Sequence, residues 1–205
     1  MTRLKSAGAI VLAGGQGSRM GRSKAMLDFG GEPLIARVVR QLRRRFDDIV
    51  IVAAPESVEH LDIAADAVKI ICDETAFQGP ADALRRGLLT VGNEIAFACS
   101  CDLPLLNADV AAALCAMLEN FDAVIPEIAG RLQPLHAVYR TACVDALEAM
   151  AARGEKRLVA IADAVKTRRV AEPELRAIDP ELRSFLNVNT PDDYALALRL
   201  AGIAG

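Results

Sequence analysis

Short hydrophobic runs alternate with longer stretches of mixed polarity along the first two thirds of the chain. Each run is four to seven residues long and almost continuously apolar. This pattern is typical of strands that are covered on both faces, as in a parallel sheet. The predicted strands are Ala7–Ala13, Ile49–Ala54, Val68–Cys72, Ile95–Cys99 and Ala123–Pro126.

The stretches between these runs have the spacing of amphipathic helices. In the first of them, Leu34, Val38 and Leu42 fall on one side, and its arginines lie largely off that side. We interpret the arginines as a solvated helix face rather than a phosphate site. The predicted helices are Pro33–Arg45, Pro80–Leu89 and Ala108–Asn120. Strands and helices that alternate with short links predict an α/β fold, a three-layer α/β/α sandwich with right-handed crossovers.

The last third of the chain is less regular and predicts both types of element. Thr190 suits a helix cap, Pro191 suits the first helical position, and the acids that follow favour the positive end of the helix. The predicted elements are strands at Gln133–Tyr139 and Thr167–Val170, and helices at Thr141–Arg153, Lys156–Ala164 and Pro191–Ala201. The sequence shows no internal repeat, low-complexity tract or linker, so we expect one domain over residues 1–205.

The composition excludes several classes of protein. Of 205 residues, 53% are hydrophobic and 25% are charged, unlike a disordered or collagen-like chain. The net charge of −3 is too small for a dedicated nucleic-acid binder. The run Ala7–Ala13 is too short to span a membrane, and no signal-peptide cleavage region follows it. We therefore expect a cytoplasmic protein with no nucleic-acid partner and no membrane partner.

The five cysteines, an odd number, indicate reduced thiols rather than a disulfide framework. Cys99 and Cys101 form a C-x-C pair, but the two histidines, His60 and His136, are distant in the sequence. A structural zinc site uses about four ligands. We therefore interpret the pair as small apolar side chains packed at the end of a buried strand.

The segment after the first predicted strand carries the strongest chemical signal. Four glycines fall within the eight residues Gly14–Gly21, so backbone N–H groups there can approach a ligand closely. Arg19, Arg22 and Lys24 add positive charge that suits a triphosphate. The spacing differs from the P-loop, in which lysine directly follows glycine, and from the dinucleotide fingerprint, which would need glycine in place of Met20. A flexible turn with surface arginines is the alternative.

The segment Leu12–Lys24, LAGGQGSRMGRSK, resembles the signature loop of the nucleotidyltransferases of molybdenum-cofactor biosynthesis. These enzymes belong to a broader group with the sugar-1-phosphate nucleotidyltransferases, in which a lysine and an arginine of this loop meet the triphosphate. The resemblance covers nearly the whole chain and implies a Rossmann-like, mostly parallel sheet of the nucleotidyltransferase type. Its further blocks are Cys72-Asp73, Gly79-Pro80, Cys101-Asp102-Leu103-Pro104, Gln133-Pro134-Leu135-His136-Ala137 and Phe185–Pro191.

The resemblance also implies a reaction. GMP would pass from GTP to the terminal phosphate of molybdopterin or the molybdenum cofactor, with release of pyrophosphate and formation of a guanine dinucleotide cofactor. GTP and the pterin are then the small-molecule partners, Mg²⁺ is the cofactor, and molybdoenzymes are transient contacts. Two alternatives stay open. One is nucleotidyl transfer of another kind, such as cytidylyl transfer to the same pterin or transfer to another small phosphate. The other is a non-catalytic nucleotide or pterin carrier.

The same resemblance assigns roles residue by residue. Lys24, Asp102 and Arg19 are the expected catalytic residues, and Asp102 is the expected Mg²⁺ ligand. The expected nucleotide-binding residues are Leu12, Ala13, Gly14, Gly15, Gly17, Lys24, Asp73, Gly79 and Asp102. The expected acceptor-binding residues are Gln133, His136, Asn187 and Asn189.

Several of these residues have a plainer interpretation. An aspartate at the position of Asp102 also suits a turn or a helix cap. Asn187 and Asn189, which share a face of an extended segment, also suit capping chemistry near Thr190. His136 lies in an apolar stretch, where a histidine is equally often packed in the core.

Two departures from the family pattern concern the choice of base. The family segment G-P-L-A-G reads GPADA over Gly79–Ala83, and many members have asparagine where this chain has Ala53. Asp82 can accept hydrogen bonds from the N–H groups of guanine, or it can face the solvent. The sequence therefore determines the type of reaction better than it determines the base.

Overall fold

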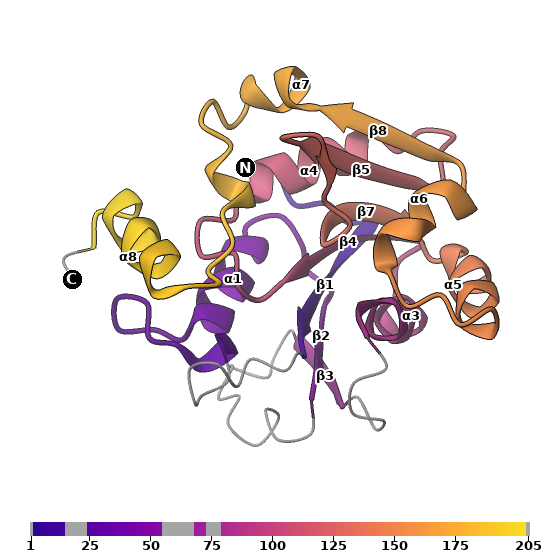
Figure 1. Cartoon of the computed structure of the whole chain (residues 1–205), viewed down its shortest axis with the longest axis horizontal. Helices are drawn as coiled ribbons and strands as arrows, with labels where there is room; N and C mark the ends of the chain where they lie inside the picture. The colour runs from indigo at the N-terminus through magenta and orange to yellow at the C-terminus, as the bar shows by residue number, and fades with distance from the viewer. Residues whose placement is uncertain (1, 15–23, 55–67, 73–78, 204–205) are drawn as a thin grey trace.

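The strands form one mixed sheet between two layers of helices (Figure 1). A computed structural model describes residues 2–14, 24–54, 68–72 and 79–203. Within these residues the sheet has eight strands, in the order β3-β2-β1-β4-β7-β5-β6, and β8 pairs with β5. The strands are β1 (Ala7–Ala13), β2 (Ile49–Ala53), β3 (Val68–Cys72), β4 (Ile95–Ser100), β5 (Ala123–Ile128), β6 (Arg131–Leu132), β7 (His136–Arg140) and β8 (Thr167–Ala171).

Parallel pairing dominates the middle of the sheet. β1 pairs in parallel with β2 and β4, and β2 pairs in parallel with β3. Every residue of β1 is buried, because strands flank both of its edges and helices cover both of its faces. Full burial of Ile10, Val11 or Leu12 contributes about 1.5–3 kcal/mol per side chain. The predicted α/β sandwich with a mostly parallel sheet is confirmed.

The strand β7 reverses the chain direction within the sheet. It lies between β4 and β5 and is antiparallel to both. It follows the β5–β6 hairpin, whose turn has positive φ at Ala129 and Gly130. The predicted strand Gln133–Tyr139 is observed as His136–Arg140, because residues 133–135 lie in the turn that leads into the strand.

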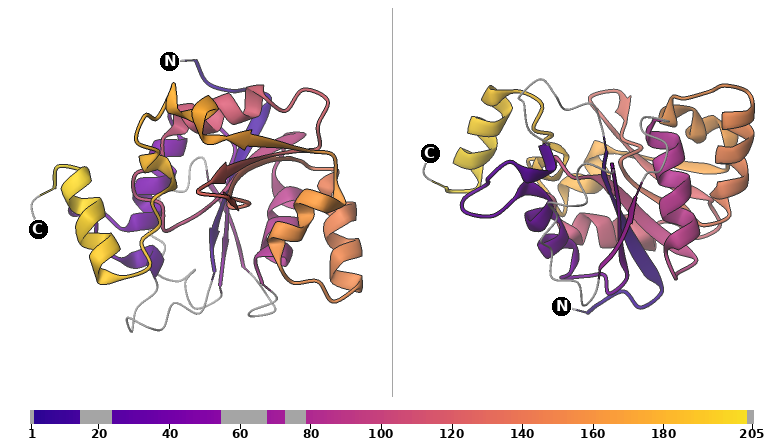
Figure 2. Two further views of the ribbon diagram at one scale, coloured as in Figure 1. Left: turned by 45° about the horizontal axis from the view of Figure 1, so that its top comes forward. Right: turned by 90° about the horizontal axis from the view of Figure 1, so that it is seen from below.

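Helices cover the two faces of the sheet (Figure 2), and each face has its own core. Leu42 of α1 and Leu114 of α4 pack in one core with Phe97 of β4. Leu84 of α3 and Leu147 of α5 belong to the core on the other face. The described helices are α1 (Leu34–Leu42), α3 (Pro80–Thr90), α4 (Ala108–Ala116), α5 (Cys143–Ala152), α6 (Ile161–Ala164), α7 (Glu172–Arg176) and α8 (Pro191–Leu200). Three short 3₁₀ turns are η2 (Lys24–Met26), η4 (Leu158–Ala160) and η5 (Arg183–Phe185).

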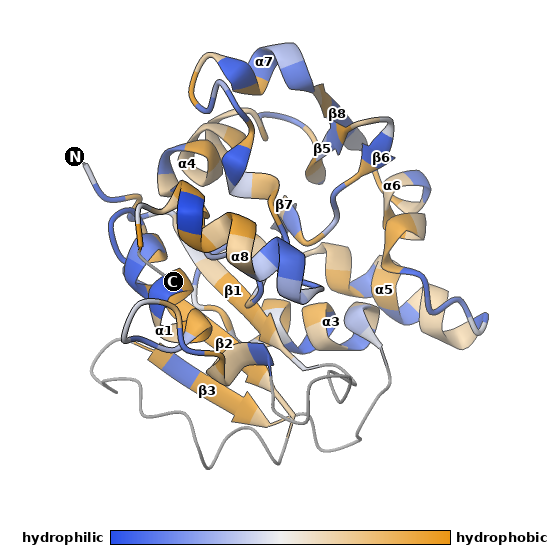
Figure 3. Cartoon of the chain, turned by 60° about the vertical axis from the view of Figure 1, so that its left-hand side comes forward, coloured by the Kyte–Doolittle hydropathy of each residue, from blue (hydrophilic) through white to orange (hydrophobic). Residues whose placement is uncertain are grey.

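A third, smaller core joins the segment before α1 to the C-terminal segment. Phe29, Val188 and Ala197 are buried together there. The rings of Phe29 and Tyr194 meet edge to face with centroids 6.0 Å apart, and the Tyr194 hydroxyl donates to the carbonyl of Asp28. Figure 3 shows α8 beside α1, with hydrophobic and hydrophilic residues along both helices. The last helix therefore packs against residues 27–34 and against the residues that lead into the helix, among them Val188.

The start of α8 has the predicted capping chemistry. The Thr190 hydroxyl accepts the backbone N–H of Asp193 at 3.1 Å, and the Asp193 carboxylate accepts the backbone N–H of Thr190 at 2.9 Å. Hydrogen bonds from Thr190 and from the backbone of Asn189 lower the pKa of the Asp193 carboxyl. Pro191 occupies the first turn, and the helix ends at Leu200.

Other helix ends differ from the prediction. Pro33–Arg45 is observed as Leu34–Leu42, and Ala108–Asn120 is observed as Ala108–Ala116, each followed by a turn. Lys156–Ala164 contains η4 and α6 instead of one helix. The elements β6 and α7 are absent from the sequence-based prediction, because segments of two and five residues leave no periodic pattern.

Cys99 and Cys101 are buried and free, as the packing interpretation requires. Burial raises the pKa of the Cys101 thiol to about 12, so this thiol stays protonated at neutral pH. Among the described residues, no group of three or more His, Cys, Asp or Glu side chains could hold a metal ion. The described helices include none with the length and apolarity needed to cross a membrane.

Candidate active site

The carboxyl ends of β1 and β4 lie side by side at one edge of the sheet. Leu12 pairs with Ser100, and the backbone N–H of Cys101 donates to the carbonyl of Leu12 at 3.1 Å. This pairing brings together the exit of β1 at Gly14 and the turn that begins at Asp102. Open parallel sheets bind their ligands at such strand ends.

Lys24, Asp102 and Asn189 meet at these strand ends. The Lys24 ammonium is 2.8 Å from the Asn189 side-chain oxygen and 3.8 Å from a carboxylate oxygen of Asp102. The side chain of Lys24 is 28% exposed and that of Asp102 is 15% exposed, so a ligand can reach both. The hydroxyl of Ser100 donates to the other carboxylate oxygen of Asp102. Three segments distant in sequence thus bring a cation, a carboxylate and an amide to one partly open site.

The segment of Asn187 and Asn189 docks directly on the turn of Asp102. The backbone N–H of Val188 donates to the carbonyl of Asp102 at 2.9 Å, and Val188 is 1% exposed. Asn187 and Asn189, on either side of it, are exposed, so they share a face as predicted. Thr190 and Asp193 supply the caps of α8, which leaves the Asn189 side chain to contact Lys24.

The exit of β1 offers backbone rather than side chains to a ligand. Leu12 and Ala13 are 4% and 5% exposed and belong to the cores, whereas Gly14 is exposed. The further residues expected to bind the nucleotide or to take part in catalysis lie outside the described residues. They are Gly15, Gly17, Arg19 and Asp73.

Gly79 begins α3 in a backbone conformation that favours glycine. Its φ is +96°, and Pro80 follows as the first helical residue. Asp82, in the first turn, forms ion pairs with Arg85 at 2.9 Å and Arg86 at 3.0 Å. Burial raises the pKa of the Asp82 carboxyl, but hydrogen bonds from Arg86 and Arg85 outweigh it and leave this pKa below its ordinary value. Both carboxylate oxygens of Asp82 are therefore used within its own helix.

Gln133 and His136 lie at the start of β7 and differ in accessibility. Gln133 is partly exposed, and its side-chain amide donates to the carbonyl of Arg131 at 3.2 Å. His136 is 2% exposed and packs between the rings of Phe97 and Phe185. Burial lowers the pKa of His136 to about 3, so its imidazole is neutral. This placement agrees with the packed interpretation of His136 and offers no charge to an acceptor phosphate.

Comparison with known proteins identifies the family. The model of the MobA-like NTP transferase domain matches residues 9–170. The chain belongs to the MobA-like NTP transferase family. It is 34% identical to the probable molybdenum cofactor guanylyltransferase of Methanosarcina acetivorans, over 93% of this chain and 89% of that protein. It is 33% identical to the molybdenum cofactor guanylyltransferase of Desulfosudis oleivorans, over 92% of each chain. The predicted nucleotidyltransferase family is confirmed.

Solved structures show the same architecture for this MobA-like chain. The molybdopterin-guanine dinucleotide biosynthesis protein A of Archaeoglobus fulgidus superposes with a TM-score of 0.81 at 26% identity, over 98% of this chain and 99% of that chain. The 2-C-methyl-D-erythritol 4-phosphate cytidylyltransferase of Thermus thermophilus superposes with a TM-score of 0.70 at 15% identity, over 96% and 98% of the two chains. The second likeness shows a shared fold alone.

The MobA-like fold also brings the loop after α5 to the start of α3. The carbonyl of Lys156 lies 3.8 Å from the position that a Cβ of Gly79 would take. Asp82, Glu155 and Lys156 line a small hollow of about 100 Å³ between these segments. Sequence reasoning missed this loop, because its charges resemble those of a solvated turn. The one local signal is Gly154, which has a positive φ of 73°.

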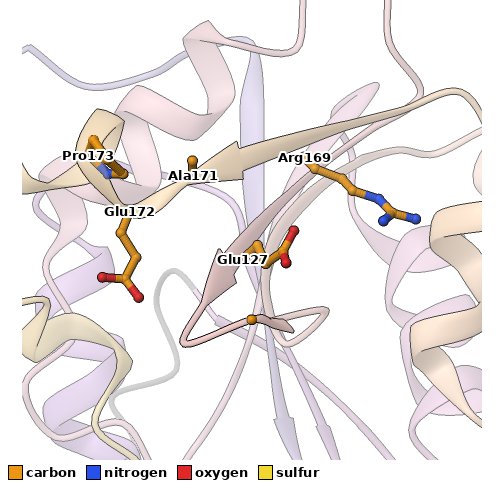
Figure 4. A pocket seen from close by; sticks show the side chains of 6 residues that line it. Glu127, Arg169, Ala171, Glu172 and Pro173 are labelled. Carbon is orange, nitrogen blue, oxygen red and sulfur yellow. The ribbon is translucent and has the colours of Figure 1, made fainter.

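A larger hollow of about 440 Å³ lies between the β5–β6 hairpin and the start of α7 (Figure 4). Its charged side chains are Glu127, Arg169 and Glu172. Arg169 pairs with Asp163 at 3.0 Å, and Glu172 accepts hydrogen bonds from the backbone of Ala129 and from an arginine of α7. Because two of these three charges already have partners within the fold, the hollow has no clear preference for a charged ligand.

Proposed function

We propose that this chain transfers GMP from GTP to the terminal phosphate of molybdopterin or of the molybdenum cofactor, with release of pyrophosphate. The observation that carries the proposal is the meeting of Lys24, Asp102 and Asn189 where β1 and β4 end. Relatives at 34% and 33% identity that are named for guanylyl transfer support guanosine as the nucleoside. The product would be a guanine dinucleotide form of the cofactor.

The reaction depends on alignment and charge neutralisation more than on acid–base chemistry. An oxygen of the acceptor phosphate, already an anion, attacks the α-phosphorus of GTP. The bond from that phosphorus to the bridging oxygen of pyrophosphate breaks, and pyrophosphate leaves with the electron pair. Asn189 and Asp102 hold the Lys24 ammonium in place before the triphosphate binds, which reduces the cost of orienting it. We assign the second cation to Arg19 by its position in the loop motif.

Asp102 is the proposed ligand of Mg²⁺. This ion prefers hard oxygen ligands and commonly takes one or two protein carboxylates, with phosphates and waters completing its shell. The partly exposed carboxylate of Asp102 and the amide oxygen of the exposed Asn187 match that preference, whereas the amide oxygen of Asn189 already accepts the Lys24 ammonium. The ion, when bound, would neutralise charge on the phosphates and on the leaving group.

The acceptor side of the site is assigned to Gln133, Asn187 and Asn189. Asn187 shares the exposed face of its segment with Asn189, so it can reach a second phosphate beside the one that Lys24 binds. Gln133 is partly exposed in the turn before β7. The neutral, enclosed imidazole of His136 does not contact the acceptor in this scheme.

The test is pyrophosphate release from each of the four common nucleoside triphosphates, with molybdopterin and Mg²⁺ present. We expect release with GTP, and a guanine dinucleotide product in the mass spectrum. Release with CTP in place of GTP would replace the proposal by cytidylyl transfer. The choice of base needs this test, because both carboxylate oxygens of Asp82 are paired with Arg85 and Arg86. Contacts to the base would then come from other groups. Binding of GTP without release would indicate a carrier.

A further inference from the structure

The segment of residues 184–189, which carries Asn189, is hydrogen-bonded to both ends of the turn of residues 102–107, which carries Asp102. At one end, the backbone N–H of Val188 donates to the carbonyl of Asp102 at 2.9 Å. At the other end, the backbone N–H of Asn107 donates to the hydroxyl oxygen of Ser184 at 2.9 Å. Because Asn189 follows Val188 directly, the position of this segment sets where the Asn189 amide meets the ammonium of Lys24.

Ser184 is the centre of a buried polar network behind that segment. It is 0% exposed, and its backbone N–H donates to the carboxylate of Asp179 at 2.8 Å. Its hydroxyl oxygen lies 3.2 Å from Nε2 of His136. That oxygen already accepts the N–H of Asn107, and it keeps one proton and one lone pair for a hydrogen bond with Nε2 in either direction. Nδ1 of His136 is buried without a hydrogen-bond partner among the described residues, so Ser184 is the polar contact of this imidazole.

The imidazole of His136 also fills the space between the sheet and the segment. Its centroid is 4.2 Å from that of Phe185 in the segment and 5.1 Å from that of Phe97 in β4. In the backbone, His136 is paired with Cys99 of β4, the strand that leads to Asp102. One rigid side chain thus contacts the segment through a hydrogen bond and a ring while its own backbone is fixed in the sheet.

We infer that His136 is a positioning residue, which places Asn189, and through it Lys24, by holding Ser184 and Phe185 against β4. The inference rests on the proposed function for its kinetic consequence but not for its geometry. It differs from the acceptor-binding role that the family resemblance implies for His136, since the imidazole acts on a reacting group only through the segment. It requires a polar group at the position of Nε2 that hydrogen-bonds with Ser184, and a flat side chain of similar size, but it requires no charge.

The kinetic test compares four single variants of the purified protein. His136→Leu removes the hydrogen bond, His136→Gln keeps a polar group that can reach Ser184, and Ser184→Ala removes the partner. Val138→Ala is the matched control, since Val138 is buried two residues further along β7, on the same face. We expect His136→Leu and Ser184→Ala to lower kcat by about tenfold to a hundredfold, the scale on which small misplacements act. His136→Gln should recover most of this loss, and Val138→Ala should keep the wild-type kcat.

A double-variant cycle separates positioning from general stability. If His136 acts through Asn189, adding His136→Leu to Asn189→Ala should cause little further loss of kcat. Losses that multiply in the double variant would overturn the inference, and so would a wild-type kcat in both His136→Leu and Ser184→Ala. An equal loss in Val138→Ala would overturn it as well, because it would show that any weakening of this core lowers the rate.

The geometric test does not depend on the reaction. The ¹⁵N side-chain amide signal of Asn189, identified by its absence in Asn189→Ala, reports the contact of this amide with Lys24. We expect this signal to shift in His136→Leu and Ser184→Ala and to stay in place in Val138→Ala. An unshifted signal in both network variants would overturn the inference. If the wild-type protein releases no pyrophosphate from any nucleotide, the proposed function fails, and the amide signal alone decides whether His136 positions Asn189.

Discussion

Lys24 faces two different partners at once, and this pair of contacts determines what the residue can do. The Asn189 side-chain oxygen, at 2.8 Å, accepts a hydrogen bond from the ammonium, whereas the carboxylate oxygen of Asp102, at 3.8 Å, is close enough to attract it but not in hydrogen-bonding contact. The ammonium is therefore oriented without being fully neutralised. In the proposed function, this arrangement gives an entering triphosphate a cation already in position and leaves one oxygen of Asp102 for a divalent ion.

Removing either charge should lower the rate strongly. We expect Lys24→Ala and Asp102→Asn each to lower turnover of GTP by about a hundredfold or more, the scale for loss of one preorganised electrostatic group. Steady-state pyrophosphate release measures the effect. Lys69→Ala and Asp47→Asn are the matched controls, because each removes one charge of a surface ion pair. Lys69 pairs with Asp48, and Asp47 pairs with Arg3. Wild-type rates in the two site variants would contradict the roles assigned to them.

His136 supplies a second prediction, on stability rather than rate. Its pKa is about 3 in the folded chain, against about 6.5 when unfolded. Between these values the unfolded chain binds a proton that the folded chain does not, so the free energy of unfolding falls as the pH falls below about 6.5. The stabilisation is complete above that pH and decreases by up to about 1.4 kcal/mol per pH unit below it.

Urea unfolding of the wild type and of His136→Gln measures this prediction. Glutamine does not titrate, so the stability difference between the two chains should narrow by about 1.4 kcal/mol when the pH falls from about 7.5 to about 5.5. His60 and the carboxyl groups occur in both chains, and their titration cancels in the difference. A constant difference across this pH range would show that His136 has the same pKa in the folded and the unfolded chain, and would contradict the prediction.

At the scale of elements, the sequence predicted the strands better than their directions. The apolar runs of β1 and β2 were enough to place them, because both faces of these strands are buried. Nothing in the run at His136–Arg140 distinguishes an antiparallel strand from a parallel one, since side chains alternate in the same way in both. The hairpin that reverses the chain is short, and only Gly130 marks its turn. The pattern of apolar residues therefore predicts that a strand is present but not whether it is parallel or antiparallel to its neighbours.

The packing of α3 on β1 leads to a prediction at a glycine. A Cβ placed on Gly87 would lie 2.5 Å from Cγ2 of Ile10, a stiff β-branched side chain that is fully buried. Alanine is the better helix former by about 1 kcal/mol, but overpacking of a core costs about 1–3 kcal/mol. We expect Gly87→Ala to lower the free energy of unfolding, by about 1 kcal/mol after both effects.

Chemical denaturation of four chains separates the two effects. They are the wild type, Gly87→Ala, Ile10→Ala and the double variant. In the Ile10→Ala background the clash is absent, so the added methyl group should have no cost or should stabilise the chain through its helix propensity. If Gly87→Ala stabilised the wild-type chain, the close approach of α3 to β1 would be wrong.

At the scale of the whole molecule, the site depends on contacts between segments that are far apart along the chain. The strand ends at Gly14 and Asp102 could be predicted as neighbours, because parallel strands end at the same edge of a sheet. The contact of Lys24 with Asn189 spans 165 positions, and no local pattern reports it. The family resemblance assigned Lys24 to the nucleotide and Asn189 to the acceptor, but it did not indicate that the two side chains contact each other. The burial of His136 likewise depends on tertiary packing that the sequence does not display. The pairing of Asp82 is different, because Arg85 and Arg86 follow it by three and four positions in the same helix, a spacing that the sequence shows.

The same organisation predicts an order of local stability. All of β1 is buried between two strands, whereas Ala197 is the one residue of α8 that is buried. Opening α8 would expose little apolar surface, and opening β1 would break the sheet and both of its cores. We expect native-state hydrogen exchange to show β1 amides opening only with global unfolding. The amides of α8 should exchange through an opening of lower free energy, which depends little on urea.

That low-energy opening of α8 would have a functional consequence, because Asn189 lies two residues before the helix. Its backbone N–H donates to the carboxylate of Asp193, which is part of the capping box of α8. When α8 opens, Asn189 loses a support for its contact with Lys24 while the rest of the sheet stays folded. A ligand that binds only the assembled site should therefore slow exchange in α8 more than in β1. The measurement is exchange with and without GTP and Mg²⁺, with Asn189→Ala as the control in which the added protection of α8 should shrink. Equal protection of α8 and β1 in the unliganded protein would contradict this order of stability.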